Sequence, residues 1–289
     1  MSRIAYVNGC YVPQREACVN VEDRGYQFAD GVYEVVHLHG GRFIDEDRHL
    51  GRLERSLGEV RIAMPMARSA LRHVLREIAE RNRVRDGLLY VQVTRGVARR
   101  DHAFPDPSTP PSLVVTIRRI PPYPTSVDNW TARAVTHPDE RWARCDIKSV
   151  GLLPNVLARQ AAREQGAIEA VLVNAEGMVT EGAATSFWIV DGQGTLRTRQ
   201  LDQHILPGCT RDALIALLRD QGVAFEQAAF SVEAMRGARE AFLTSATSFV
   251  KPIVAIDGQP VGNGGVGPVT RRLFALFARH VHGGLSNAA

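Results

Sequence analysis

Three prolines within four residues, Pro121, Pro122 and Pro124, set the strongest limit on how this chain can fold. Consecutive prolines hold the backbone extended and lack an amide hydrogen, so this stretch cannot continue a helix or the interior of a sheet. We therefore predict a linker at residues 121–125, between a smaller domain at residues 1–120 and a larger one at residues 126–289. The chain has 289 residues, 45% of them hydrophobic, which is enough for two cores.

Strand-like and helical patterns are mixed in both predicted domains. Runs of β-branched and aromatic residues predict strands at residues 4–12, 32–38, 88–94, 113–117, 130–136, 170–174, 186–190 and 241–244. Apolar residues spaced by three and four predict helices at residues 47–62, 68–82, 154–165, 211–221 and 270–280. Because the first half lacks a regular alternation of strand and helix, the pattern indicates an α+β protein of two domains.

The charge is balanced, with 35 basic and 31 acidic residues mixed along the chain and a formal net charge of +4. This balance favours neither nucleic acid nor a membrane surface as a partner. Residues 1–9 have no apolar run of signal-peptide length, and no segment reaches the roughly 20 apolar residues of a membrane span, so we expect a cytoplasmic protein. The four cysteines form no C-x-x-C pair and are expected to be buried free thiols.

Only two of the basic residues, Lys148 and Lys251, are lysines. Arginine cannot lose its proton to become a nucleophilic amine, so a chain rich in arginine can retain lysine for that chemistry. Lys148 follows Ile147 and precedes an apolar run that begins at Leu152, which predicts partial burial, and burial disfavours a charged amine. This context suits a Schiff-base lysine, and the alternative is a lysine that caps a loop. The chain has no P-loop, G-x-S-x-G or H-E-x-x-H string.

Several longer strings give a more specific signal. They occupy residues 22–34, 95–96, 100–102, 144–149, 180–182, 208–212 and 244–245. In these strings the chain resembles the fold type IV aminotransferases that depend on pyridoxal phosphate, and within them the D-amino-acid transaminases. The strings follow the family order over nearly the whole chain, which no single motif would do.

The resemblance implies a two-domain α+β enzyme of fold type IV with pyridoxal 5'-phosphate as cofactor. Its expected reaction moves the amino group of a D-amino acid such as D-alanine to a 2-oxo acid such as 2-oxoglutarate, giving pyruvate and D-glutamate. Relatives with the same cofactor chemistry act on L-branched-chain amino acids or on (R)-amines. A non-catalytic protein on this fold is a further alternative.

Matched position by position, the resemblance also implies which residues contact the ring of the cofactor. Lys148 is expected to form the Schiff base with pyridoxal phosphate and to move the proton of the substrate α-carbon. Glu181 corresponds to the carboxylate that pairs with the pyridine nitrogen, although by itself it would be interpreted as a solvated glutamate in a turn. Tyr33 matches the tyrosine beside the lysine, and Val35 would share its face of a strand. For a lone tyrosine, core packing is the alternative.

The cofactor phosphate is expected to bind Arg52 and the start of a helix where Cys209 and Thr210 present backbone amides. Ser245 matches a hydroxyl contact of the family. The next position carries a hydroxyl in the family but is Ala246 here, which offers only its backbone N–H. One missing charge-assisted hydrogen bond costs ~1.5 to 3 kcal/mol at most, so we expect weaker cofactor binding and not its loss.

Arg100 and His102 match the pair that binds the substrate α-carboxylate in D-amino-acid transaminases. The planar fork of arginine suits a carboxylate. In the family this loop reaches the active site of the neighbouring subunit, so the resemblance implies a homodimer whose active sites are completed by the partner. Without the resemblance, the arginines of this loop would be interpreted as solvated charges.

Overall fold

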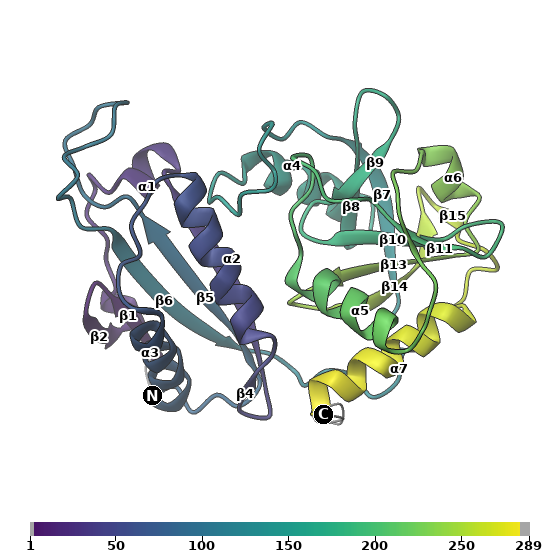
Figure 1. Ribbon diagram of the computed structural model, residues 1–289, viewed down its shortest axis with the longest axis horizontal. Coiled ribbons are helices and arrows are strands. Elements are labelled where there is room, and N and C mark those ends of the chain that lie inside the picture. The colour runs from purple at the N-terminus through teal and green to yellow at the C-terminus, as the bar shows by residue number, and fades with distance from the viewer. Residues whose placement is uncertain (1–2, 284–289) are drawn as a thin grey trace. The chain divides into compact units, whose positions relative to one another are not determined.

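The computed structural model describes residues 3–283 and divides into two compact units (Figure 1). The first unit comprises Met1–Pro122 and Ile147–Gly151, and the second comprises Tyr123–Asp146 and Leu152–Ala289. The chain first passes from one unit to the other inside the proline-rich stretch. The short segment with Lys148 then returns to the first unit.

The first unit is built on a six-stranded antiparallel sheet with the strand order β2-β1-β6-β5-β3-β4. Its strands are β1 (Ile4–Val7), β2 (Cys10–Pro13), β3 (Gly31–His39), β4 (Arg42–Phe43), β5 (Gly87–Thr94) and β6 (Ser112–Arg119). Its helices are α1 (Arg24–Phe28), α2 (Glu46–Glu59) and α3 (Arg68–Arg81). Helices α2 and α3 lie on one face of this sheet (Figure 1). Their apolar side chains pack with those of the sheet and form the core.

Strand β3 shows how the two faces of this sheet differ. Val32, Glu34 and Val36 are fully buried, whereas Tyr33 and Val35 between them are only partly buried. Successive side chains of a strand point to opposite faces, so the buried set faces the helices. The other set faces away from the helices, which leaves Tyr33 and Val35 accessible.

The second unit is built on a nine-stranded mixed sheet, described here for residues up to 283, with the main order β12-β11-β10-β13-β14-β7-β8-β9 and with β15 beside β14. Its strands are β7 (Ala132–Pro138), β8 (Glu169–Val173), β9 (Val179–Gly182), β10 (Ser186–Val190), β11 (Leu196–Thr198), β12 (Glu226–Gln227), β13 (Glu240–Ser245), β14 (Phe249–Ile256) and β15 (Gln259–Pro260). Its helices are α4 (Leu153–Glu164), α5 (Cys209–Asp220), α6 (Val232–Arg236) and α7 (Pro268–His282). Helix α4 packs against β7 and β8, and α5 and α7 pack against β13.

Strand β13 is buried on both faces. Ala241 and Leu243 belong to a core that includes Met235 of α6. Phe242, on the opposite face, stacks on Trp188 of β10 with ring centres 5.5 Å apart. A strand with apolar residues on both faces needs a cover on each side, and the helices of this unit supply it.

Strand β14 differs from the expected elements because it contains Pro252, and a proline usually argues against a central strand. Its pairing with β7 begins only at Ile253, so the missing amide hydrogen of Pro252 breaks no bond on that side.

The expectation of four buried thiols is wrong for Cys10 and Cys18, which are exposed, whereas the other two cysteines are buried. The short elements α1, α6, β4, β9, β11, β12 and β15 also lie outside the expected ranges.

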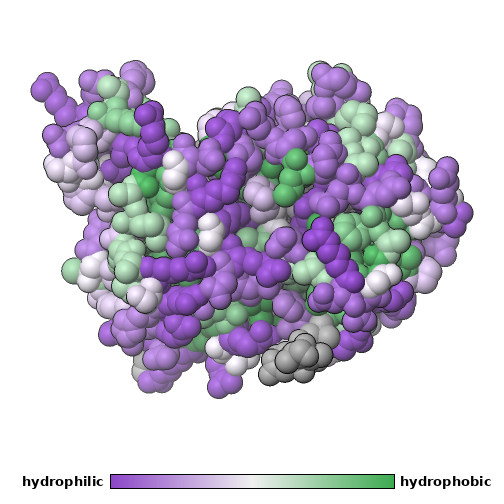
Figure 2. Space-filling model, in the orientation of Figure 1, coloured by the Kyte–Doolittle hydropathy of each residue, from purple (hydrophilic) through white to green (hydrophobic). Residues whose placement is uncertain are grey.

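Hydrophilic side chains cover most of the face shown in Figure 2, with small apolar patches among them. Within residues 3–283, no helix is long and apolar enough to cross a membrane. The same residues contain no group of three or more histidines, cysteines or carboxylates arranged to hold a metal ion.

Candidate active site

Lys148 and Tyr33 are in contact in the first unit. The Lys148 amine donates to the Tyr33 hydroxyl over 3.3 Å and lies 4.3 Å from the centre of the tyrosine ring. Both side chains are partly exposed. The phenol therefore fixes the position of an amine that a ligand can still reach.

Backbone pairing brings these two residues together although they are 115 positions apart. The Tyr33 N–H donates to the Lys148 carbonyl, and the Val150 N–H donates to the Gly31 carbonyl, both over 3.0 Å. The Lys148 N–H also donates to the hydroxyl of Ser56 in α2 over 3.4 Å. Residues 148–150 thus pair with the start of β3 through an isolated antiparallel bridge of Ser149 with Val32, and this pairing sets where the lysine lies.

Arg52 lies on the same face of α2 as Ser56, one helical turn away, and its guanidinium is bound by Glu34. Arg52 Nε and Nη2 donate to the two Glu34 oxygens over 2.7 and 2.9 Å, and His49 Nδ1 lies 2.8 Å from Glu34 Oε2. Burial alone would raise the Glu34 pKa, but the Arg52 charge and the hydrogen bonds from Arg52 and His49 lower it to about 2. The Arg52 side chain is therefore fixed by an ionised carboxylate. Its contact with a phosphate stays a prediction.

Neither the resemblance nor the spacing of the motifs predicts a role for Glu34. The available signal was its position between Val32 and Val36 on the buried face of a strand, because a carboxylate at such a position requires a buried cation.

Tyr33 and Val35 lie on the same face of the sheet as two residues of the neighbouring strand β5, Tyr90 and Gln92. The Tyr33 and Tyr90 rings are 5.5 Å apart, and the Tyr90 hydroxyl donates to the Gln92 amide oxygen over 2.7 Å. Burial and the neighbouring Tyr33 raise the pKa of Tyr90 to about 12. This face therefore carries two phenols and one amide beside the lysine, with no carboxylate in that group of side chains.

Arg100 and His102 lie on the loop after β5, which rises beside α1 (Figure 1). Both are exposed. The Arg100 guanidinium carbon is 4.5 Å from the centre of the Phe28 ring, and the His102 ring centre is 5.4 Å from the same ring. The described contacts of these two side chains are with α1 and not with Lys148 or Tyr33.

Glu181 is buried on β9 of the second unit and is held by Arg141. Arg141 Nη1 donates to Glu181 Oε1 over 2.5 Å, and the Leu206 N–H donates to the same oxygen over 3.1 Å. Arg141 is also paired with Asp139, with an Nη2 to Oδ2 distance of 2.8 Å. Burial would lower the Arg141 pKa, but hydrogen bonds to Asp139 and the Glu181 charge raise it above its usual value. Arg141 is therefore a fixed cation beside Glu181, a role that the sequence patterns do not indicate.

Helix α5 begins at Cys209, directly after Gly208, which has no side chain to cap the first amides. A methyl group on Gly208 would come within 2.7 Å of the Ser186 hydroxyl, so the backbone here passes close to the start of β10. Ser186 in turn pairs with Thr244 near the end of β13. Uncapped amides at a helix N-terminus and the helix dipole together favour a bound anion.

Ser245, the last residue of β13, belongs to a small group of hydroxyls. Its Oγ lies 2.8 Å from the Ser248 Oγ and 2.9 Å from the Thr247 Oγ1. Ala246 interrupts this group with a side chain that cannot bond an anion. Thr247 is exposed and directly follows Ala246, so it offers a hydroxyl next to the position where the family pattern has one.

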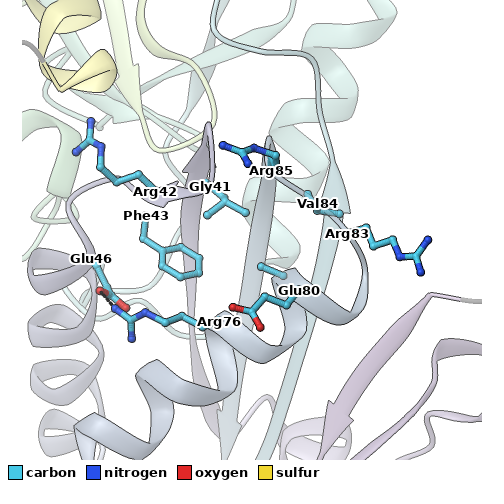
Figure 3. Close-up of a pocket in the computed structure, with 11 residues that line it drawn as sticks. Gly41, Arg42, Phe43, Glu46, Arg76, Glu80, Arg83, Val84 and Arg85 are labelled. Atoms are coloured by element: carbon cyan, nitrogen blue, oxygen red, sulfur yellow. Dashed lines mark hydrogen bonds and ion pairs between the residues drawn. The ribbon is translucent and has the colours of Figure 1, made fainter.

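A surface cavity of about 620 Å³ in the first unit contains none of these residues. Arg42, Arg83 and Arg85 at its rim point outward in different directions (Figure 3). Arg76 approaches Glu46, with an Nη2 to Oε2 distance of 3.3 Å. Because the guanidinium groups diverge, they do not form a converging anion site, and we assign no ligand to this cavity.

The family model described as amino-transferase class IV matches residues 31–256 of the chain. The chain belongs to this family. Class IV aminotransferases use pyridoxal phosphate. The expected enzyme class, cofactor and α+β fold of type IV are therefore confirmed.

Two curated relatives of this aminotransferase are D-alanine aminotransferases. The one from Staphylococcus haemolyticus is 37% identical over 276 residues, which cover 96% of this chain and 97% of the relative. The one from Bacillus licheniformis is 38% identical over 266 residues, which cover 92% of this chain and 93% of the relative.

Solved structures similar to this aminotransferase include a T.th. branched-chain amino acid aminotransferase with pyridoxamine 5'-phosphate. It has a TM-score of 0.87 and 26% identity, and the match covers 98% of this chain and 95% of that one. A hypothetical aminotransferase from Mycobacterium tuberculosis in a PLP-bound form has a TM-score of 0.81 at 20% identity, over 97% of this chain and 99% of that one. The second likeness supports the fold alone.

The residues of this aminotransferase fit its cofactor. The first unit offers a primary amine beside a phenol, which suits an aldehyde-bearing cofactor. The second unit offers a carboxylate beside a fixed cation and an uncapped helix N-terminus near a group of hydroxyls. These are the partners that a pyridine nitrogen and a phosphate dianion need.

Proposed function

We propose that the protein transfers the amino group of a D-amino acid such as D-alanine to a 2-oxo acid such as 2-oxoglutarate. The identity to two D-alanine aminotransferases over more than nine-tenths of the chain carries this proposal. The second candidate is a branched-chain L-amino-acid or (R)-amine transaminase, favoured by the fold shared with the T.th. branched-chain enzyme. Its lower identity of 26% makes it the weaker of the two.

In the proposed mechanism, Lys148 holds the cofactor and then moves the substrate's α-proton. Pyridoxal phosphate, when bound, supplies the electron sink for the α-carbon. The Lys148 amine is tethered beside that carbon, so proton transfer needs no encounter with a free base. The Tyr33 hydroxyl, 3.3 Å from the amine, orients it. The Glu181 carboxylate, held in place by Arg141, would pair with the pyridine nitrogen of the bound cofactor and favour its protonated form.

The phosphate is proposed to bind Arg52 and the N-terminus of α5, where Cys209 and Thr210 contribute backbone amides. Ser245 contributes a hydroxyl, and Ala246 contributes its backbone N–H. A helix N-terminus and a guanidinium both favour a dianion, and their attractions add. The Glu34 carboxylate limits the directions in which the Arg52 guanidinium can point.

Arg100 and His102 are proposed to bind the substrate α-carboxylate, with Tyr33 and Val35 lining the same substrate site. We infer that the protein is a homodimer in which this loop reaches the partner's active site. Exposed apolar side chains support this inference, because large patches of this kind often mark interfaces. Among the described residues, five of eleven such side chains belong to residues 19–26 and 97–104: Val19, Val21, Tyr26, Val97 and Phe104.

A backbone pairing of Asp23 with Val97 joins these two segments, so their apolar side chains belong to one region of the first unit. Arg100 and His102 lie on the same loop. We also propose that the protein acts in the cytoplasm.

A comparison of two amino donors tests the substrate proposal. The purified protein is given 2-oxoglutarate with either D-alanine or L-leucine at equal concentrations. Pyruvate is measured with lactate dehydrogenase, and the glutamate formed is separated by chiral chromatography. We expect faster transfer from D-alanine and D-glutamate as the product. Preference for L-leucine with L-glutamate as product would instead support the branched-chain function.

A further inference from the structure

We propose that Asp30 is a positioning residue that holds Arg100 and His102 in place through Arg24. The inference rests on the proposed function, in which these two side chains bind the substrate carboxylate. We call residues 95–104 the clamp loop. The evidence is a chain of contacts that starts at Asp30, passes through two buried arginines and ends at the backbone of the clamp loop.

The first contact ties Asp30 to the start of the clamp loop. Arg95 is buried, and its Nε and Nη2 donate to the two Asp30 oxygens over 2.7 and 2.9 Å. The remaining Arg95 donors reach the carbonyls of Arg61 and Val60 over 2.9 and 2.8 Å. A bidentate pair with further backbone bonds leaves the guanidinium one orientation. The first residue of the loop is therefore fixed.

The second contact ties Asp30 to the middle of the clamp loop. The Arg24 side chain is only 4% exposed, and its Nε donates to Asp30 Oδ2 over 2.8 Å. Its Nη1 donates to the Asp101 carbonyl over 2.6 Å, and its Nη2 lies 3.5 Å from the His102 carbonyl. Arg24 thus holds the backbone between Arg100 and His102, and Asp30 sets the direction in which Arg24 points.

Two aromatic rings contact the buried arginines, and one of them also contacts Arg100 of the clamp loop. The Phe28 ring lies 4.8 Å from the Arg24 guanidinium carbon and 4.5 Å from that of Arg100. The Phe104 ring lies 3.7 Å from the Arg95 guanidinium carbon. A movement of Arg24 or Arg95 would therefore displace the rings on which the exposed part of the loop rests.

Electrostatics explains why one carboxylate can control two arginines. Burial would raise the Asp30 pKa, but hydrogen bonds and charges from Arg95 and Arg24 lower it. Without the Asp30 charge, two neighbouring buried guanidinium groups would repel each other. We expect Arg24 then to turn away and release the Asp101 carbonyl.

The test compares Asp30→Asn with Asp106→Asn, the same change at an exposed residue beyond the clamp loop whose side chain accepts hydrogen bonds from Ser108. For Asp30→Asn we expect the KM of D-alanine and of 2-oxoglutarate to rise about tenfold, the low end of the effect of losing a charged contact. We expect kcat within about twofold and unchanged cofactor absorbance, because Lys148 and Glu181 are untouched. Asp106→Asn should match the wild type.

A second pair of variants separates positioning from general damage to the fold. Asp30→Asn in an Arg100→Ala background should raise KM by less than about twofold, since the guanidinium contact that Asp30 positions is already gone and only that of His102 remains. Arg24→Gln keeps the pair of Asp30 with Arg95 and should give the same rise in KM, which covers the case that Asp30→Asn does not fold. A full tenfold rise in the Arg100→Ala background, or unchanged KM in Arg24→Gln, would overturn the proposal. If the wild type forms no pyruvate from D-alanine, the proposed function fails instead.

Discussion

Replacing Glu34 with glutamine removes one buried charge and keeps the shape of the side chain. Glu34 has a pKa of about 2 in the folded protein against an ordinary value of 4.5. At about 1.4 kcal/mol for each pKa unit, the ionised carboxylate contributes on the order of 3 kcal/mol to the free energy of unfolding at pH 7. We expect Glu34→Gln to lose an amount of this size, because Arg52 keeps its buried charge but loses the Glu34 carboxylate.

The pH dependence follows from the direction of the pKa shift. A carboxyl with a lowered pKa in the folded state stabilises fully above its unfolded pKa, and the contribution disappears as the pH falls through the folded value. The difference between the wild type and Glu34→Gln should therefore be constant above about pH 5.5 and fall to roughly half near pH 3. Comparison at each pH removes the titration of all other groups that the two proteins share.

Urea unfolding followed by circular dichroism measures this difference at each pH. Glu77→Gln is the matched control, because it is the same change at a glutamate that also pairs with an arginine. The Glu77 side chain is 26% exposed, and it bonds Arg81 on the surface of α3 over 2.9 Å. Such a surface pair is worth about 0 to 1 kcal/mol. A loss in Glu34→Gln no larger than that of Glu77→Gln, or a loss that does not shrink at low pH, would refute the reasoning.

Three further predictions concern the site and the thiols. Glu181→Gln should lower turnover by on the order of a hundredfold while cofactor absorbance is retained, and unchanged turnover would mean that another residue faces the ring nitrogen. Arg100→Ala should lower kcat/KM by about tenfold to a hundredfold for D-alanine and 2-oxoglutarate alike, and untouched D-alanine kinetics would contradict the carboxylate contact. A thiol reagent at pH 8 should label the exposed Cys10 and Cys18 quickly and Cys145 slowly, since burial raises the Cys145 pKa to about 11. Rapid labelling of Cys145, read by mass spectrometry, would show that its burial is wrong.

The main helices and most longer strands could be predicted because their signals are local. The apolar spacing in residues 47–62 depends only on neighbouring positions, and α2 occupies Glu46–Glu59. The contact of Lys148 with Tyr33 depends instead on two backbone bonds between distant segments. The resemblance could assign both residues to one cofactor, but only the structure gives the pairing of residues 148–150 with β3.

The partners of the site residues were not predictable, for a related reason. Arg141 and Glu181 are 40 positions apart with β8 between them, so no spacing rule links them. Asp30 lies inside one of the quoted strings, yet its two arginines come from positions 24 and 95, and their convergence depends on how α1 packs beside β5. The sequence does not predict strand β14, because Pro252 argues against a central strand. The position at which pairing with β7 begins cannot be inferred from the sequence.

Borohydride reduction followed by peptide mapping tests the central claim most directly, because the chain has only two lysines. Reduction should fix one cofactor per chain on the peptide that contains Lys148 and leave Lys251 unmodified. Lys251 is a demanding internal control, since burial lowers its pKa and its amine lies 3.5 Å from the centre of the Trp130 ring. Cofactor on Lys251, or a Lys148→Ala protein that transaminates at the wild-type rate, would contradict the account.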